Sequence, residues 1–120
     1  MDANGSEAIF HMEGGSYTID QHVLKVMIYT RYIRFLPVTW ERSICLRVEV
    51  YHLYYLNSAE AQGMESGVIS NSQMSASSQW SNLERAHYGR LHVKETQHNA
   101  GGRVARTNDE NQWLQIDLNN

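Results

Sequence analysis

The sequence predicts an all-β chain. Two runs alternate between apolar and polar residues with a period of two, at Ile44–Tyr51 and at Asn111–Leu118. A third run, Ile28–Val38, is rich in aromatic and β-branched residues. Period-two alternation is typical of strands with one buried face, and β-branched and aromatic residues fit the pleated surface of a sheet. Glycine and serine stretches between these runs indicate turns.

The first two strong runs are close together in the chain. Pro37 has no amide hydrogen to donate, so it marks the end or the edge of the first strand. The polar stretch Trp40–Ser43 then makes a connection short enough for Ile28–Val38 and Ile44–Tyr51 to pair with each other. Upstream, residues 1–16 contain two glycine turns. Tyr17–Met27 is ambiguous between helix and strand, and we interpret it as a strand.

The second half of the chain begins with a turn at residues 63–67. Val68 and Ile69 follow as apolar anchors, and Met74 and Ala76 alternate with serines. Residues 94–102 are polar and read as a loop. In Asn111–Leu118 the leucines and Ile116 are expected inward, while Trp113 has outward parity and is expected beneath a neighbouring loop.

Bulk composition excludes several classes of function. The chain has 120 residues, 42% hydrophobic and 19% charged, which is the composition of one small globular domain. Its net charge of −3 leaves no basic excess for a phosphate backbone, so we expect no nucleic-acid partner. We also expect no transmembrane segment and no signal peptide, because no apolar run is long enough.

The residues that could carry chemistry point away from catalysis. Cys45 is the only cysteine, and its strand-like neighbours suggest a buried, inert thiol. Among the histidines, His87, His92 and His98 come nearest to a metal-ligand set, but their spacing would not converge on one strand face. Serines are plentiful near residues 66–81, yet no strained nucleophile turn is present. We therefore expect no enzyme activity, no metal and no cofactor.

Five motifs resemble the discoidin family, also called the F5/8 type C module. The head of such a module is similar to GMESG at 63–67 with the serine-rich run to Trp80, GRLH at 89–92, and QWLQIDL at 112–118. The tail is similar to TRYIRFLPVTW at 30–40 with ICLRVEVY at 44–51. The resemblance implies a tail portion (residues 1–53), a linker (54–61) and a head portion (62–120). It therefore implies a partial jelly-roll β-sandwich with incomplete sheets, because the central strands of the module are missing.

This sequence departs from the family pattern at three positions. The family usually joins the ends of the module with a disulfide, but Leu53 stands at the first cysteine position and Asn57 or Ser58 at about the second. Such a bridge is typically worth ~2–4 kcal/mol. The family also usually has a tryptophan where this chain has Arg103. A guanidinium at that position is costly if it is buried without partners.

The resemblance also implies where a partner would bind. Loops at one end of the sandwich carry recognition in the family, and loops on a rigid scaffold commonly do so. The first loop follows the Ala-Ser-Ser triplet, and its indole and leucine could enter a lipid interface, stack on a sugar or fill a protein pocket. The second precedes the QWLQIDL strand. The expected ligand-binding residues are Trp80, Ser81, Asn82, Leu83, Asn108 and Asp109.

Two organisations and three functions stay open. The chain is either a fragment of a tandem array or a permuted mini-domain in which the tail packs on the head. The leading function is a non-catalytic adhesion or recognition module that binds cell-surface glycans, phospholipid head groups or extracellular proteins. The alternatives are a truncated product that associates through open sheet edges, and a carbohydrate-binding appendage of a larger enzyme. The family resemblance places the protein outside the cell or at its surface.

Overall fold

The structure is a computed structural model that describes residues 9–12, 19–24, 28–55 and 58–119. The chain divides into two compact units, Met1–Thr30 and Arg31–Asn120, which are described separately. In the first unit the described residues form no strand or helix, and the rings of Phe10 and His22 lie 4.8 Å apart. The strand expected over Tyr17–Met27 is therefore wrong for residues 19–24, and the rest of that range lies outside the described residues. Its apolar residues do not alternate, so they give a strand no face to bury.

The second unit is built from short strands and two 3₁₀-helices, and no α-helix occurs in the described part of the chain. The all-β prediction is confirmed. In chain order the elements are β1 (Tyr32–Phe35), β2 (Cys45–Leu46), β3 (Tyr51–Tyr55), β4 (Ser58–Ala61), η1 (Asn71–Gln73), β5 (Met74–Ala76), η2 (Ala86–Tyr88), β6 (Glu95–Thr96), β7 (Asn99–Ala100), β8 (Arg103–Val104) and β9 (Leu114–Asp117).

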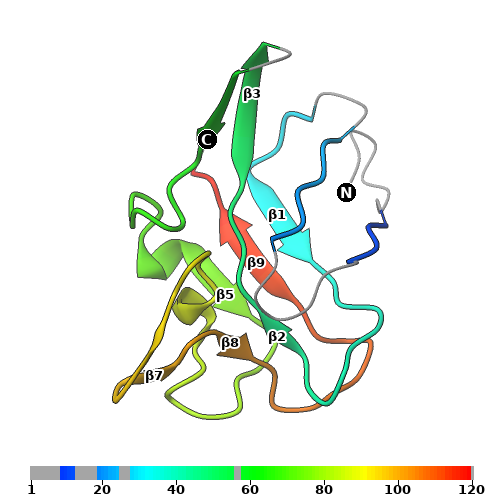
Figure 1. Cartoon of the computed structure of the whole chain (residues 1–120), viewed down its shortest axis with the longest axis vertical. Helices are drawn as coiled ribbons and strands as arrows, with labels where there is room; N and C mark the ends of the chain where they lie inside the picture. The colour runs from blue at the N-terminus through cyan, green and yellow to red at the C-terminus, as the bar shows by residue number, and fades with distance from the viewer. Residues whose placement is uncertain (1–8, 13–18, 25–27, 56–57, 120) are drawn as a thin grey trace. The chain divides into compact units, whose positions relative to one another are not determined.

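The main sheet has the order β1-β9-β5, with both pairs antiparallel (Figure 1). Strand β9 lies in the middle because its sequence alternates cleanly, so that Leu114 and Ile116 are both fully buried. Together with Met64, Ile69 and Met74 they form the core. The inward residues of Asn111–Leu118 are thus as predicted for β9.

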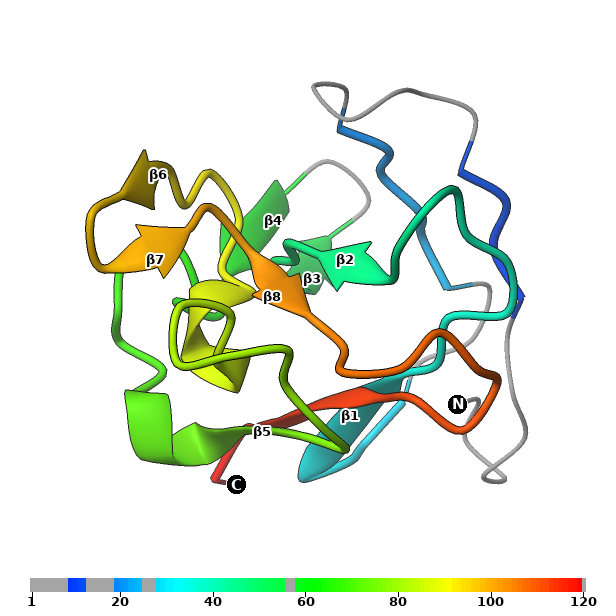
Figure 2. The same ribbon diagram turned by 90° about the horizontal axis from the view of Figure 1, so that it is seen from below.

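Three two-stranded sheets complete the unit, with the pairs β2-β8, β3-β4 and β6-β7. Figure 2 shows β2 and β8 on one side of the core and β1, β9 and β5 on the other. This is a sandwich with a three-stranded layer facing a two-stranded one. The small antiparallel sheets agree with the expected partial β-sandwich.

The two halves of the chain pair with each other. Strand β1 pairs with β9 and β2 with β8, so the predicted pairing of Ile28–Val38 with Ile44–Tyr51 is wrong. Each of the two runs instead finds its partner downstream, β1 over four residue pairs and β2 over two. This pairing of the tail portion with the head portion is the contact expected for a permuted mini-domain. That the chain is a fragment of a tandem array stays a prediction.

Side chains reinforce the pairing of β1 with β9. The Arg31 guanidinium donates to both carboxylate oxygens of Asp117 at 2.9 Å, and Arg34 donates twice to the side chain of Gln115. The Arg34 guanidinium also lies 4.2 Å from the ring centre of Trp113, a cation–π contact. Trp113 is therefore covered by a side chain of β1, where we had expected a loop.

The alternation in Ile44–Tyr51 is preserved although the strand is short. Ile44 is 1% exposed, and Leu46, Val48 and Val50 pack against the core. Val48 exchanges backbone hydrogen bonds with Gly89 and Leu91 in place of a continuous strand partner. The parity prediction is confirmed, and the strand itself is limited to Cys45–Leu46.

The prediction of a buried Cys45 is wrong, because the residue is exposed. It occupies the outward parity of β2. Its sulfur nevertheless packs close to Gly102, where an added Cβ would lie 3.0 Å away. This desolvation raises the pKa of the Cys45 thiol, so the sulfur stays protonated and weakly reactive near neutral pH.

Two stretches expected to be irregular contain hairpins. The linker, residues 54–61, lies largely in the β3-β4 hairpin, and residues 94–102 contain the β6-β7 hairpin. Of the two expected apolar anchors, Ile69 is buried but Val68 is 79% exposed. The carbonyl of Gly63 accepts hydrogen bonds from the amides of Gly67 and Ile69. Gly63 has a φ of 106°, which glycine adopts readily, and in the resulting turn Val68 points outward.

Arg103 is fully buried beside this core. Its Nη2 donates to the carbonyls of Ser78 and Trp113, each at 3.2 Å. Its Nε and Nη1 are buried with no hydrogen-bond partner. Desolvation lowers the pKa of the guanidinium, and an unpaired buried charge of this kind is expensive.

We therefore expect Arg103→Met to raise the free energy of unfolding by about 1–4 kcal/mol, because an apolar side chain removes the uncompensated charge. Urea unfolding of both proteins measures the change, with Arg85→Met at an exposed position as the control. A clear loss of stability would mean that the bonds to Ser78 and Trp113 outweigh the desolvation of the charge.

Candidate functional site

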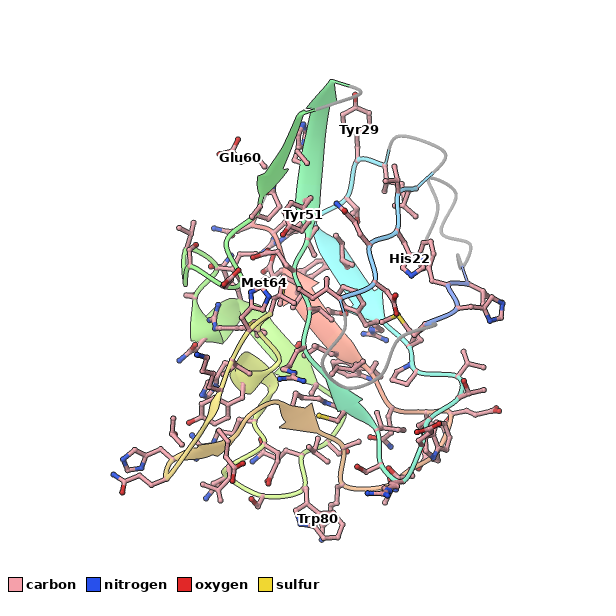
Figure 3. The ribbon with its side chains drawn as sticks, viewed as in Figure 1. His22, Tyr29, Tyr51, Glu60, Met64 and Trp80 are labelled. Atoms are coloured by element: carbon pink, nitrogen blue, oxygen red, sulfur yellow. The ribbon has the colours of Figure 1, made fainter. Side chains whose placement is uncertain are left out.

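Loops of the head portion meet a turn of the tail portion at one end of the second unit. They surround an open pocket of about 390 Å³ that is lined by Arg42, Ser43, Trp80, Val104, Ala105 and Asn108. Figure 3 shows Trp80 at the end of this unit away from Glu60 of β4. The pocket thus brings together two predicted site residues, Trp80 and Asn108, from different loops.

Trp80 has a fixed backbone and an exposed side chain. Its amide donates to the carbonyl of Val104 at 3.0 Å, which ties the loop to β8. Its indole is 68% exposed and forms one wall of the pocket. An aromatic ring held open on a rigid base is available for stacking or for insertion into a partner.

The residues after Trp80 shape the loop more than the pocket. The hydroxyl of Ser81 donates to Glu84 and accepts the amide of Leu83, which closes a tight turn. Asn82 accepts a hydrogen bond from Gln79, and Leu83 is 43% exposed. None of these three predicted residues lines the pocket described above, so their role as ligand contacts stays a prediction.

Asn108 works as a clamp between the two halves of the chain. Its Oδ1 accepts the amide of Ile44 at 2.9 Å, and its Nδ2 donates to the carbonyl of Arg42 at 3.2 Å. One side-chain amide thus satisfies two backbone groups of the tail portion. The residue lies at the pocket, as predicted, but its polar atoms are already engaged.

Asp109 belongs to a hydrogen-bond network centred on Gln112, which is 6% exposed. Gln112 donates to Asp109 and Thr107 and accepts the hydroxyls of Ser77 and Ser78. Hydrogen bonds from Gln112, Thr107 and the amide of Asn111 lower the pKa of Asp109. The carboxylate therefore fixes the second loop, and its predicted role in ligand binding is not tested by this geometry.

Arg42 is a charged pocket residue that the sequence did not identify. The sequence predicts only a polar connection at Trp40–Ser43, yet Arg42 and Ser43 both line the pocket. Arg42 has a φ of 59°, a left-handed conformation that is uncommon for a residue with a Cβ. No local pattern could have found it, because its position depends on a clamp by Asn108, more than sixty residues downstream.

The remaining polar clusters are used in structure. The carboxylate of Glu49 accepts hydrogen bonds from the amides of Val50, Met64 and Glu65. Glu49 also lines a second, shallow pocket. The Nδ1 atom of His92 is hydrogen-bonded to Glu65 at 2.8 Å, so His92 has a structural partner different from His87 and His98. No group of three potential metal ligands occurs within the described ranges. Over the same residues, no helix has the length and apolar character needed to cross a bilayer.

Known proteins resemble most of this chain. Coagulation factor V from Bos taurus is 34% identical over 125 residues, which cover 96% of the chain and 5% of that protein. The non-catalytic subunit of the venom prothrombin activator omicarin-C from Oxyuranus microlepidotus is 34% identical over 94% of the chain and 8% of its own length. Lactadherin from Mus musculus is 32% identical over 83% of the chain and 23% of its own length. No family model matches the chain, and no solved structure matches it significantly.

We expect Asn108→Ala to lower the free energy of unfolding by about 1–3 kcal/mol, because the amide of the buried Ile44 loses its acceptor. Urea unfolding measures the loss. Asn108→Asp keeps the acceptor but removes the donor to Arg42, so its loss should be smaller. Asn82→Ala, which removes one 3.4 Å contact on the neighbouring loop, is the matched control. Equal stability of Asn108→Ala and the unchanged chain would contradict the clamp.

Proposed function

The chain belongs to the discoidin, or F5/8 type C, family, and from this premise we propose that it is a non-catalytic recognition module. It binds its partner through the loops at one end of a partial β-sandwich. The one observation that carries the proposal is the exposed indole of Trp80, held by its backbone at the wall of a pocket. Exposed aromatic side chains on a rigid scaffold are frequent energetic centres of recognition.

The partner class is a cell-surface glycan, a phospholipid head group or an extracellular protein, and the protein acts outside the cell. Family membership supports this. One relative is named as a non-catalytic subunit, which supports binding in place of catalysis. The chain spans only 5 to 23% of the length of the relatives described above, so their own activities do not transfer to it directly.

The arrangement of the chain also supports a module boundary within it. One continuous match to factor V covers 96% of the chain, so the tail-like and head-like blocks occur in the same order in that relative. This supports a tail portion (1–53), a linker (54–61) and a head portion (62–120) taken from successive repeats. The pairing of β1 with β9 supports closure of these portions on each other when they stand alone.

A second candidate function is association with another chain through open sheet edges. In the sheet β1-β9-β5, the outer sides of β1 and β5 have no neighbouring strand among the described residues. Such edges can pair with a strand from another chain. Tyr32, on edge strand β1, is also 44% exposed.

For the recognition function, we expect Trp80→Ala to weaken binding about 10-fold or more, because an aromatic anchor in a binding site typically contributes ~2 kcal/mol or more. The full chain is tested against immobilised glycans, phosphatidylserine vesicles and extracellular matrix proteins. Val68→Ala, which shortens a similarly exposed apolar residue of another turn, should bind as the unchanged chain does. Binding that is unaffected by Trp80→Ala on every surface would overturn the proposal.

For association through sheet edges, we expect the chain to dimerise or oligomerise with increasing concentration. Light scattering coupled to size-exclusion chromatography measures its mass. Replacement of the half-exposed Tyr32 on β1 by lysine places a charge on this edge strand and should reduce the association if that edge is used. A constant monomer mass over the concentration range counts against this second function.

A further inference from the structure

We propose that the pocket beside Trp80 binds an acidic sugar, with Arg42 holding the carboxylate and the indole of Trp80 stacking on the sugar ring. The inference rests on the proposed function, since it assigns a ligand class and a polar contact to the same end of the sandwich. It adds a residue of the tail portion to a site that the sequence placed wholly in the head portion.

The guanidinium of Arg42 is available to a ligand. Arg42 lines the pocket and is exposed, and none of the described residues is paired with its guanidinium. Arg31 and Arg90, by contrast, are engaged in structure, through Asp117 and Asn71 respectively. A free planar guanidinium at a concave site is suited to two parallel hydrogen bonds with one carboxylate.

The backbone holds Arg42 in place before any ligand arrives. Its φ of 59° is sparsely populated for residues with a Cβ, and such conformations persist where the surroundings enforce them. The side chain of Asn108 donates to the backbone carbonyl of Arg42, and the amide of Ser43 donates to the backbone carbonyl of Glu41 at 2.6 Å. The strained turn is thus fixed from both sides, which lowers the conformational cost of binding.

The rest of the pocket suits one sugar ring. The Trp80 indole gives an aromatic wall, Val104 and Ala105 supply apolar contacts, and the hydroxyl of Ser43 can donate or accept a hydrogen bond. Its volume of about 390 Å³ is near the lower end of the ~300–1,000 Å³ range of small-molecule sites. One aromatic face and one cation match a ring that carries a single carboxylate.

The charges around the pocket disfavour an anionic membrane as the ligand. The turn and the loop at the pocket carry three acidic residues, Glu41, Asp109 and Glu110, against the two basic residues Arg42 and Arg106, and the whole chain has a net charge of −3. Membrane attraction needs several basic residues, each of which contributes ~1 kcal/mol near the surface. Arg42 can still hold one carboxylate through two short, directional hydrogen bonds, whereas attraction to a membrane depends on the summed charge of the surface.

The test is titration of the ¹⁵N-labelled full chain with 3′-sialyllactose and with a glucuronic-acid disaccharide, followed by NMR. Lactose is the neutral control. We expect either acidic sugar to shift the indole N–H signal of Trp80, which is assigned by its loss in Trp80→Phe.

Arg42→Gln should weaken this binding at least ~10-fold, as expected for loss of a charged hydrogen bond. Arg42→Lys should restore part of it. Lys94→Gln, which removes the same charge from an exposed site outside the pocket, should bind as the unchanged chain does.

Three results would overturn the inference. One is the absence of any shift with both acidic sugars, and another is equal binding of lactose. The third is unchanged binding by Arg42→Gln when its spectrum shows a folded chain. If phosphatidylserine vesicles or a protein bind through Trp80 while the acidic sugars do not, the ligand class is wrong and the recognition function stands. If Trp80→Ala changes no binding at all, both proposals fail.

Discussion

Closure of the tail portion on the head portion is the constraint on which the second unit depends. Strand β9 can bury Leu114 and Ile116 because it has β1 on one side and β5 on the other. The bidentate pair of Arg31 with Asp117 sets the register at the end of β1. Its net energy is small at an exposed site, so the closure rests mainly on the apolar face of β9. Without this closure, β2 would lose its partner β8, and β9 would keep only β5.

The same closure creates the candidate site. Arg42 and Ser43 come from the tail portion, whereas Trp80 and Asn108 come from the head portion. Asn108 connects them through two hydrogen bonds to backbone groups of the tail turn. The network around Gln112 then holds the loop that carries Asn108. Fold and site are therefore one system, since each loop at the pocket is anchored by contacts between residues far apart in sequence.

The sequence predicted the buried positions, which depend on alternation within one strand. It missed the features that depend on contacts with residues far away in the chain. The alternation around Ile44 and Leu114 correctly gave the buried positions, because a strand places every second residue on one face. It could not give the partners of those strands, so the pairing of the two tail runs was wrong. Trp80 was identified as a site residue from the resemblance to the discoidin family. Arg42 was missed because its turn is shaped by Asn108, and no residue near it in sequence reveals that contact.

Binding at this pocket must also affect the stability of the fold. The unit carries one clear internal cost, the buried Arg103 with two unpaired nitrogens, and it lacks any intramolecular disulfide. A ligand that contacts both Arg42 and Trp80 can bind only when tail and head are closed, because those residues come from the two portions. By mass action it stabilises the closed state by RT ln(1 + [L]/Kd), which is ~2.7 kcal/mol at a ligand concentration of 100 times Kd. Such a gain is comparable to the range typical of a missing disulfide. A module held together by its own binding site would therefore be most stable when it is occupied.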